Sequence, residues 1–187
     1  MKLKLEEIAD LSLGKSLSRI SKKYTGEKAT RNVLYHRKQD LFIEEDEVAK
    51  DSDLLSIAEN GDIILKMSEP QTAIKVSEES MIKEGTVIPS QFTILKMKNE
   101  NVDEDFLIYL LNSKSFENQL KKINQGIIKR IKITDLNKLE LDIPTIEKQK
   151  DIVKYLKLID EEIEWEKKLI KEKENLKEGL IQELSNS

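Results

Sequence analysis

The sequence contains no cysteine and only one histidine, His36, among its 187 residues. Without cysteine the chain can form neither a disulfide nor a thiolate metal site. With a single histidine, no Ser/His/Asp or Cys/His catalytic set can be defended. We therefore predict a protein that is not an enzyme by itself and that holds neither a metal nor a cofactor.

Long hydrophobic runs and glycine-rich loops are also missing. No apolar run approaches the roughly eighteen residues of a membrane-spanning helix, and the N-terminus lacks a signal-peptide pattern, so we expect a cytoplasmic protein. The GKS at 14–16 is not a phosphate-binding loop, because Ala9 stands where that motif requires glycine. The acidic residues 44–53 lack the spacing of a calcium loop and are expected to form a solvated turn.

Charge is abundant but unevenly distributed. The formal net charge is −4, yet residues 1–40 carry ten Lys/Arg against five Asp/Glu, and residues 119–138 carry six against one. Between them, residues 41–62 carry one against eight. If folding brings the two basic islands together, they form a positive surface suited to a phosphate backbone. The alternative is that these charges are scattered and solvated.

Residues 145–184 contain one glycine and no proline, and Pro144 precedes them. Thr145 can cap the start of a helix, which would be about 60 Å long. Because such a helix is longer than a small domain is wide, it needs a partner helix; the alternative is packing along its own domain. The expected interface follows coiled-coil spacing, with a stutter near the middle, and consists of Ile152, Leu156, Ile159, Ile163, Leu169, Ile170, Leu176, Leu180 and Leu184.

Two polar residues, Glu166 and Lys173, interrupt this apolar seam. Polar residues at seam positions reduce stability but fix register and orientation. An antiparallel pair of helices could bring Glu166 of one chain close to Lys173 of the other.

The remaining sequence predicts an α+β fold with a small mixed or antiparallel sheet. Residues 1–10 are expected to form a strand or a helical turn, and 11–31 a loop with a possible strand at its start. Helices are expected after Asp103 and from Ser115 to about Asn124. Strands are expected at 32–43, 62–67, 72–76, 86–97, 125–133 and 139–143.

Several stretches, in this order, resemble one half of the specificity (S) subunit of type I restriction-modification systems. They are GDIILKMSEP (61–70), VIPSQFTIL (87–95), DEDFLIYLLNS (103–113), GIIKRIKITDLNKLELDIP (126–144) and EKQKDIVKYLKLIDEEI (147–163). The resemblance implies a DNA target-recognition domain at 1–143 followed by a spacer helix at 144–187. It also implies methyltransferase (M) subunits as partners, and through them restriction (R) subunits, with catalysis and S-adenosylmethionine belonging to those partners.

Full-length members carry two recognition domains and two antiparallel helices, whereas this chain has one of each. We therefore expect double-stranded DNA as ligand and an antiparallel coiled-coil homodimer, or pairing with another S subunit. A homodimer would read a split palindrome, because protein symmetry is mirrored in the half-sites. The rival interpretations are a dimeric scaffold without a DNA role and an inactive remnant.

The DNA-binding residues are expected in the basic islands and their loops. Arginines suit base edges and phosphates, because a planar guanidinium can donate two parallel hydrogen bonds. Lysines mainly neutralise phosphates. The expected set is Lys15, Ser16, Ser18, Arg19, Lys22, Lys23, Arg31, Gln125, Lys129, Arg130 and Lys132.

Overall fold

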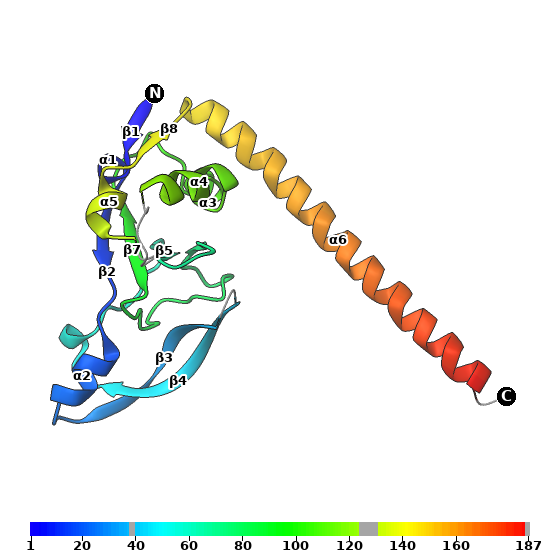
Figure 1. Ribbon diagram of the computed structural model, residues 1–187, viewed down its shortest axis with the longest axis horizontal. Helices are drawn as coiled ribbons and strands as arrows, with labels where there is room; N and C mark the ends of the chain where they lie inside the picture. The colour runs from blue at the N-terminus through cyan, green and yellow to red at the C-terminus, as the bar shows by residue number, and fades with distance from the viewer. Residues whose placement is uncertain (38–39, 124–130, 186–187) are drawn as a thin grey trace.

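The computed structural model describes residues 1–37, 40–123 and 131–185. A head of strands and short helices precedes one long helix, α6, which runs away from it (Figure 1). The predicted α+β fold with a long C-terminal helix is confirmed. Within the described residues, none of the helices combines the length and apolarity that crossing a membrane would require.

The centre of the head is an antiparallel four-stranded sheet with the strand order β2-β7-β5-β6. Side chains alternate between its faces, so Ile63 and Leu65 of β5 join one core cluster while Ile64 joins another. The strands are β2 (Ala9–Leu13), β5 (Ile63–Lys66), β6 (Ala73–Lys75) and β7 (Phe92–Met97).

Four short helices contribute buried side chains to the larger cluster, together with Ile63, Leu65 and Leu95 of the sheet. Asp103 caps the helix that begins at Glu104, since its carboxylate accepts the Phe106 N–H at 2.9 Å. The helices are α1 (Leu5–Ile8), α3 (Glu104–Leu111), α4 (Lys114–Ile123) and α5 (Ile133–Asn137).

The opposite face of the sheet is covered by a long hairpin of β3 (Lys28–Arg37) and β4 (Asp40–Ala49). Leu34 of the hairpin is buried in the cluster that includes Ile64, Phe92 and Ile94. Helix α2 (Leu17–Lys23) lies beside the hairpin at the end of the head farthest from the start of α6 (Figure 1). A 3-10 turn, η1 (Ser52–Leu54), follows β4.

Two expectations for this region are wrong. Residues 11–31 are not mainly loop, because they contain α2 and the first part of β3. The acidic residues 44–49 are not a turn but part of β4, where they pair with 28–33. The hairpin forms through ladder hydrogen bonds, so a run of charges on its exposed surface does not end the strand.

Other boundaries also differ. Residues 32–37 and 40–43 belong to two strands rather than one, and β7 begins only at Phe92, after Pro89. The predicted strand at 125–133 lies mostly outside the described residues. Its last residue, Ile133, begins α5 instead.

A separate pair of strands, β1 (Lys2–Lys4) and β8 (Glu140–Asp142), delivers the chain to α6 (Ile146–Ser185). The first turns of α6 dock on the head, where Val153 is buried in the core and Ile152 packs against it. Beyond them, α3 contacts α6 through Lys157–Asp105 and Tyr109–Asp160, each at 2.5 Å. From Lys157 to Leu184 every residue of α6 is exposed.

Candidate nucleic-acid interface

A close backbone approach positions the basic helix α2. Gly14 is buried, its N–H donates to the Phe92 carbonyl at 3.0 Å, and a Cβ at this position would lie 2.1 Å from the Pro89 carbonyl oxygen. No side chain fits there. The glycine of the GKS sequence therefore seats the chain against the segment before β7, so that α2 starts beside the hairpin.

The amphipathic pattern of α2 decides which side faces outward. Leu17 and Ile20 pack against the buried residues Val33, Val48, Leu55 and Val87. Arg19, Lys22 and Lys23 are exposed, and two of these cations lie in the last turn, where they interact favourably with the helix dipole. The head therefore presents three cations of the first basic island on one short helix.

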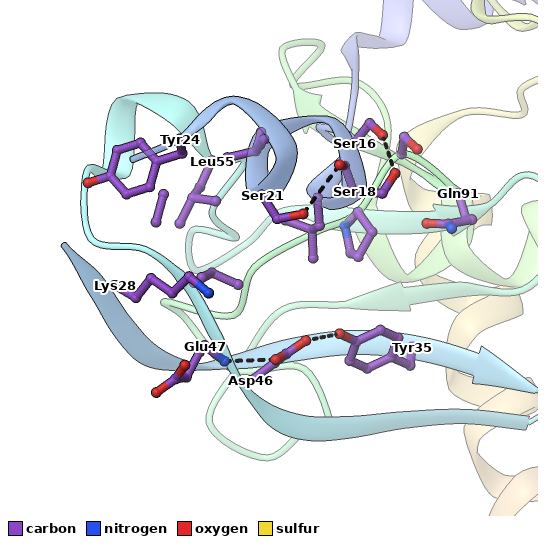
Figure 2. A pocket seen from close by; sticks show the side chains of 16 residues that line it. Ser16, Ser18, Ser21, Tyr24, Lys28, Tyr35, Asp46, Glu47, Leu55 and Gln91 are labelled. Carbon is purple, nitrogen blue, oxygen red and sulfur yellow. Dashed lines mark hydrogen bonds between the residues drawn. The ribbon is translucent and has the colours of Figure 1, made fainter. Parts of the chain in front are cut away.

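A polar cleft of about 460 Å³ lies between α2 and the hairpin (Figure 2). Hydroxyl, carboxylate and amide groups line it next to apolar side chains. Its lining residues are Ser16, Leu17, Ser18, Ile20, Ser21, Tyr24, Lys28, Tyr35, Asp46, Glu47, Val48, Ala49, Leu55, Pro89, Ser90 and Gln91.

Tyr35 and Asp46 form the hairpin wall of this cleft. The Tyr35 hydroxyl donates to Asp46 Oδ2 at 2.6 Å, and the Glu47 N–H donates to Asp46 Oδ1 at 2.8 Å. Burial raises the pKa of Tyr35 to about 12, with the hydrogen bond to Asp46 as the second cause. The Tyr35 hydroxyl and the Glu47 N–H together fix the position of the Asp46 side chain.

Two of the expected DNA-contacting residues, Ser16 and Ser18, line the cleft. Their hydroxyl oxygens lie 3.3 Å apart, and Ser21 Oγ donates to the Ser18 carbonyl at 3.2 Å (Figure 2). Lys15, in the same segment, donates to the Asp53 carbonyl. The serines therefore present hydroxyls at the cleft, whereas Lys15 ties its segment to η1.

Arg31 is placed differently from the cations of α2. It is half-buried on β3, opposite Asp46 in the strand register, and one guanidinium nitrogen donates to the Lys50 carbonyl at 3.3 Å. At least part of its hydrogen-bonding capacity is therefore used inside the hairpin.

The second basic island does not line the cleft in the part of the chain that the structure describes. Gln125, Lys129 and Arg130 lie outside the described residues. Lys132 is exposed immediately before α5, and α5 packs against α1 and β2.

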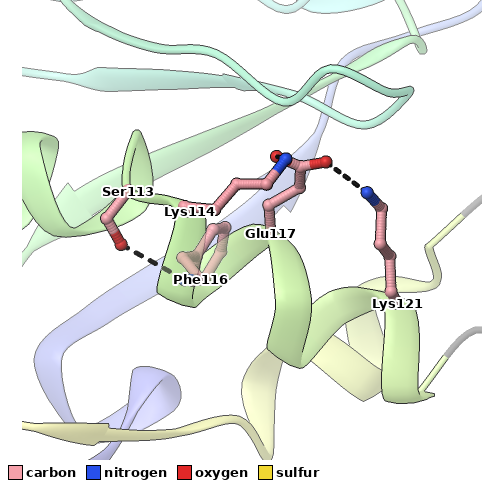
Figure 3. A network of polar contacts seen from close by, with 5 residues as sticks. All are labelled: Ser113, Lys114, Phe116, Glu117 and Lys121. Atoms are coloured by element: carbon pink, nitrogen blue, oxygen red, sulfur yellow. Dashed lines mark hydrogen bonds and ion pairs between the residues drawn. The ribbon is translucent and has the colours of Figure 1, made fainter.

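On α4, Lys114 and Lys121 both pair with Glu117 (Figure 3). Lys114 and then Lys121 lower the pKa of Glu117 to about 2. These two lysines therefore already pair with a carboxylate of their own chain, which makes them less suited to binding phosphates.

Some residues of the cleft were not predicted from the sequence. Lys28, Tyr35, Asp46 and Gln91 come from three separate segments. Asp46 belongs to an acidic run that looks like solvated surface, and only the folded hairpin brings its side chain within reach of the Tyr35 hydroxyl. The spacing of Leu17, Ile20 and Tyr24 was an available sign of a helix at α2.

The apolar seam of α6 is open to solvent over most of its length. Ile152 and Leu156 are half-buried, whereas the predicted seam residues from Ile159 onward are exposed, from 42% at Ile163 to 79% at Leu184. Trp165 is 71% exposed, with Lys168 Nζ 5.0 Å from its ring centroid. The head therefore leaves this stripe uncovered, as expected for a helix that needs a partner.

The described chain thus combines a small head, which carries a basic helix beside a cleft, with a long helix that is exposed from Lys157 to Leu184. The chain matches the family described as "Type I restriction modification DNA specificity domain" over residues 1–175, and it belongs to this family. The resemblance to type I specificity subunits is thereby confirmed. The match is to a specificity component, which also confirms the prediction of a non-catalytic subunit.

The specificity subunit of type I restriction enzyme MjaVIII from Methanocaldococcus jannaschii is 29% identical over 185 residues, which cover 95% of this chain and 42% of that protein. The chain therefore spans less than half of that relative's length.

Solved structures share the fold. A chain from a structure of type I R-M assembly and conformational transition aligns with a TM-score of 0.57 and 18% identity, over 87% of this chain and 38% of the other. The HsdS subunit from Thermoanaerobacter tengcongensis aligns with a TM-score of 0.53 and 16% identity, over the same shares.

Proposed function

We propose that this chain is the DNA-specificity subunit of a type I restriction-modification system and that it reads one half of a split DNA site. The family match carries this proposal, because residues 1–175 include both the head and most of α6. Methyltransferase subunits, and through them a restriction subunit, would dock on the chain and supply the chemistry. The chain itself would contribute sequence recognition and geometry.

The head would contact DNA with α2 and the adjoining cleft. Arg19, Lys22 and Lys23 are exposed cations that suit phosphates, and Arg19 also suits a guanine edge. Asp46 has the opposite preference, since a carboxylate repels phosphate but accepts a hydrogen bond from the amino group of cytosine or adenine. The cations on α2 would thus position the DNA backbone, and the hydrogen-bond acceptors in the cleft would read the bases.

The homodimer follows from the uncovered stripe on α6. The helix has 40 residues and is about 60 Å long, and its seam is exposed from Ile159 to Leu184. A second copy would cover the same stripe by twofold symmetry and place a second head at the opposite end of the pair. Two identical heads would then read an interrupted palindrome.

The DNA face can be tested with the double variant Lys22→Glu/Lys23→Glu, co-expressed with methyltransferase subunits. DNA binding by the complex should weaken, and the slope of log affinity against log salt should fall by about two, because each lysine contributes about one unit. Lys2→Glu/Lys4→Glu on β1, at the other end of the head (Figure 1), makes the same charge change and serves as the control. Equal binding and an equal slope for both variants would contradict a DNA role for α2.

The homodimer can be tested by sedimentation of Ile159→Asp/Ile163→Asp. Two carboxylates in the apolar seam should yield monomers, because burying an unpaired charge costs far more than a seam contact contributes. Lys154→Asp/Lys171→Asp places the same groups outside the predicted seam and should leave the dimer intact. A seam variant that still sediments as a dimer would contradict pairing through this stripe.

A further inference from the structure

The seam of α6 changes its position around the helix near the middle. In the first half it follows Ile159, Ile163, Glu166 and Ile170, with alternating steps of four and three residues. In the second half it follows Leu169, Lys173, Leu176 and Leu180. Counted backward from Leu180, the second half has the same sequence of steps as the first half counted forward from Ile159. The stutter therefore makes the stripe from Ile159 to Leu180 symmetric about the point between Leu169 and Ile170.

We infer that α6 binds α6 of a second copy in one antiparallel register, with the twofold axis between Leu169 and Ile170. This inference rests on the homodimer of the proposed function and adds its register. Each seam residue between Ile159 and Leu180 of one copy then faces a seam residue of the other. The facing pairs are Leu169 with Ile170, Glu166 with Lys173, Ile163 with Leu176, and Ile159 with Leu180.

Charge selects this register over its neighbours. In it, Glu166 of each copy faces Lys173 of the other, so the symmetric pair contains two layers with opposite charges. A shift by one heptad in one direction would place Glu166 against Glu166, and a shift in the other direction Lys173 against Lys173. A parallel pair in register would place like charges together at both layers, which is unfavourable.

The single chain leaves these two charges available. Lys167 pairs with Glu164 at 2.7 Å, and Lys168 lies over the Trp165 ring, so neighbouring cations have contacts on their own helix. Within the described residues, Glu166 and Lys173 form no ion pair. The apolar residues that would face each other around them are all exposed: Ile159, Ile163, Leu169, Ile170, Leu176 and Leu180.

Cysteine cross-linking tests the register directly, because the chain has no cysteine of its own. Chains carrying Glu166→Cys, mixed with chains carrying Lys173→Cys, should form a disulfide-linked dimer on oxidation. Neither variant alone should cross-link, because like positions lie seven residues, about 10 Å, apart along the pair, beyond the reach of a disulfide. Efficient self-linking of either variant would overturn the register.

Charge reversal provides the second measurement. Glu166→Lys or Lys173→Glu alone creates two like-charged layers and should raise the dimer dissociation constant at least about tenfold in sedimentation. The double variant Glu166→Lys/Lys173→Glu restores opposite charges and should recover the wild-type constant. Equal constants for the wild type and both single variants would overturn the register.

Sedimentation of the wild type distinguishes a failure of the inferred register from a failure of the proposed homodimer. A wild-type dimer without a link between positions 166 and 173 would overturn the register and leave the homodimer standing. A monomeric wild type would overturn the homodimer itself.

Discussion

Gly14 shows how a single residue positions the candidate DNA interface. Its missing side chain lets the backbone pass the Pro89 carbonyl at a distance that any Cβ would occupy. Because the obstacle is backbone rather than a flexible side chain, alanine cannot be accommodated by a rotamer change. The glycine therefore fixes where α2 begins relative to the cleft.

Gly14→Ala should lower the free energy of unfolding by about 1–3 kcal/mol, the usual range for overpacking. Gly179→Ala is the matched control, because Gly179 lies in α6 with nothing within 4 Å of an added Cβ. There alanine should raise helix stability by about 0.5–1 kcal/mol. Chemical denaturation measures both variants, and a neutral Gly14→Ala would contradict the close approach.

Tyr109 predicts a pH dependence at the contact between α3 and α6. Burial raises its pKa to about 12, followed by its hydrogen bond to Asp160. A tyrosine whose folded pKa lies above the unfolded value of about 10 stabilises the fold fully below pH 10. This contribution should disappear as pH rises from about 10 to 12.

Ultraviolet titration of tyrosinate measures this pKa, with Tyr109→Phe identifying the transition that belongs to Tyr109. Asp160→Asn should lower the pKa, because it removes a negative charge beside the phenolate. A pKa for Tyr109 that is unaffected by Asp160→Asn would contradict the contact.

At the level of elements, Gln149 joins α6 to the head. It is fully buried, its Oε1 accepts the Asp103 N–H at 2.8 Å, and its Nε2 donates to the Asn101 and Pro144 carbonyls at 2.9 Å each. One amide side chain therefore connects the first turn of α6, the residue that caps α3, and the loop before α3. The connection fixes the direction in which α6 leaves.

Gln149→Ala should reduce the free energy of unfolding by about 2–4 kcal/mol, because it leaves several buried polar groups without partners. Hydrogen exchange at the Asp103 amide should accelerate as well. Lys148→Ala, at the exposed neighbouring position, should change stability by no more than about 0.5 kcal/mol. Similar unfolding energies for the two variants would contradict the role of Gln149.

Elements with a clear hydrophobic period could be predicted from the sequence. Helices α3, α4 and α6 and the strands β5, β6 and β8 lie where periodicity, the cap at Asp103 and Pro144 place them. The β3–β4 hairpin could not be placed in this way, and α2 was missed although Leu17, Ile20 and Tyr24 have helical spacing. The hairpin carries a run of acidic residues on an exposed strand and depends on its contacts with the sheet. Helix α2 is rich in serine and lysine, and its two apolar residues pack against the cluster of Val33, Val48, Leu55 and Val87.

The same limit applies to the site. Residue type alone suggested Ser16, Ser18 and the cations of α2, and the structure places them at or beside one cleft. Composition cannot show that Tyr35 and Asp46 face them, because that requires the register of two paired strands. The charge of the second basic island suggested that it forms one surface with the first. Its described residues instead lie on or beside α4 and α5 and do not line the cleft.

For the whole molecule, the inferred register would set the separation of two heads in the proposed dimer. The last buried residue of α6, Val153, marks the end of its anchor on the head. With the twofold axis between Leu169 and Ile170, the two copies of Val153 lie 33 residues apart along the pair, or about 50 Å at 1.5 Å per residue. In the proposed dimer, the length of α6 between anchor and axis would act as a ruler for the spacer between DNA half-sites.

Inserting one heptad that continues the seam between Leu169 and Ile170 keeps every facing pair, because the added residues lie on the axis. The anchors should separate by about 10 Å more, which corresponds to a spacer up to about three base pairs longer at 3.4 Å per step. The half-site sequences should stay the same, since the heads are unchanged. Methylome mapping of cells expressing the variant with its methyltransferase subunits measures both features. An unchanged spacer with intact methylation would contradict the ruler, because the heads would then be held at a distance that α6 does not set.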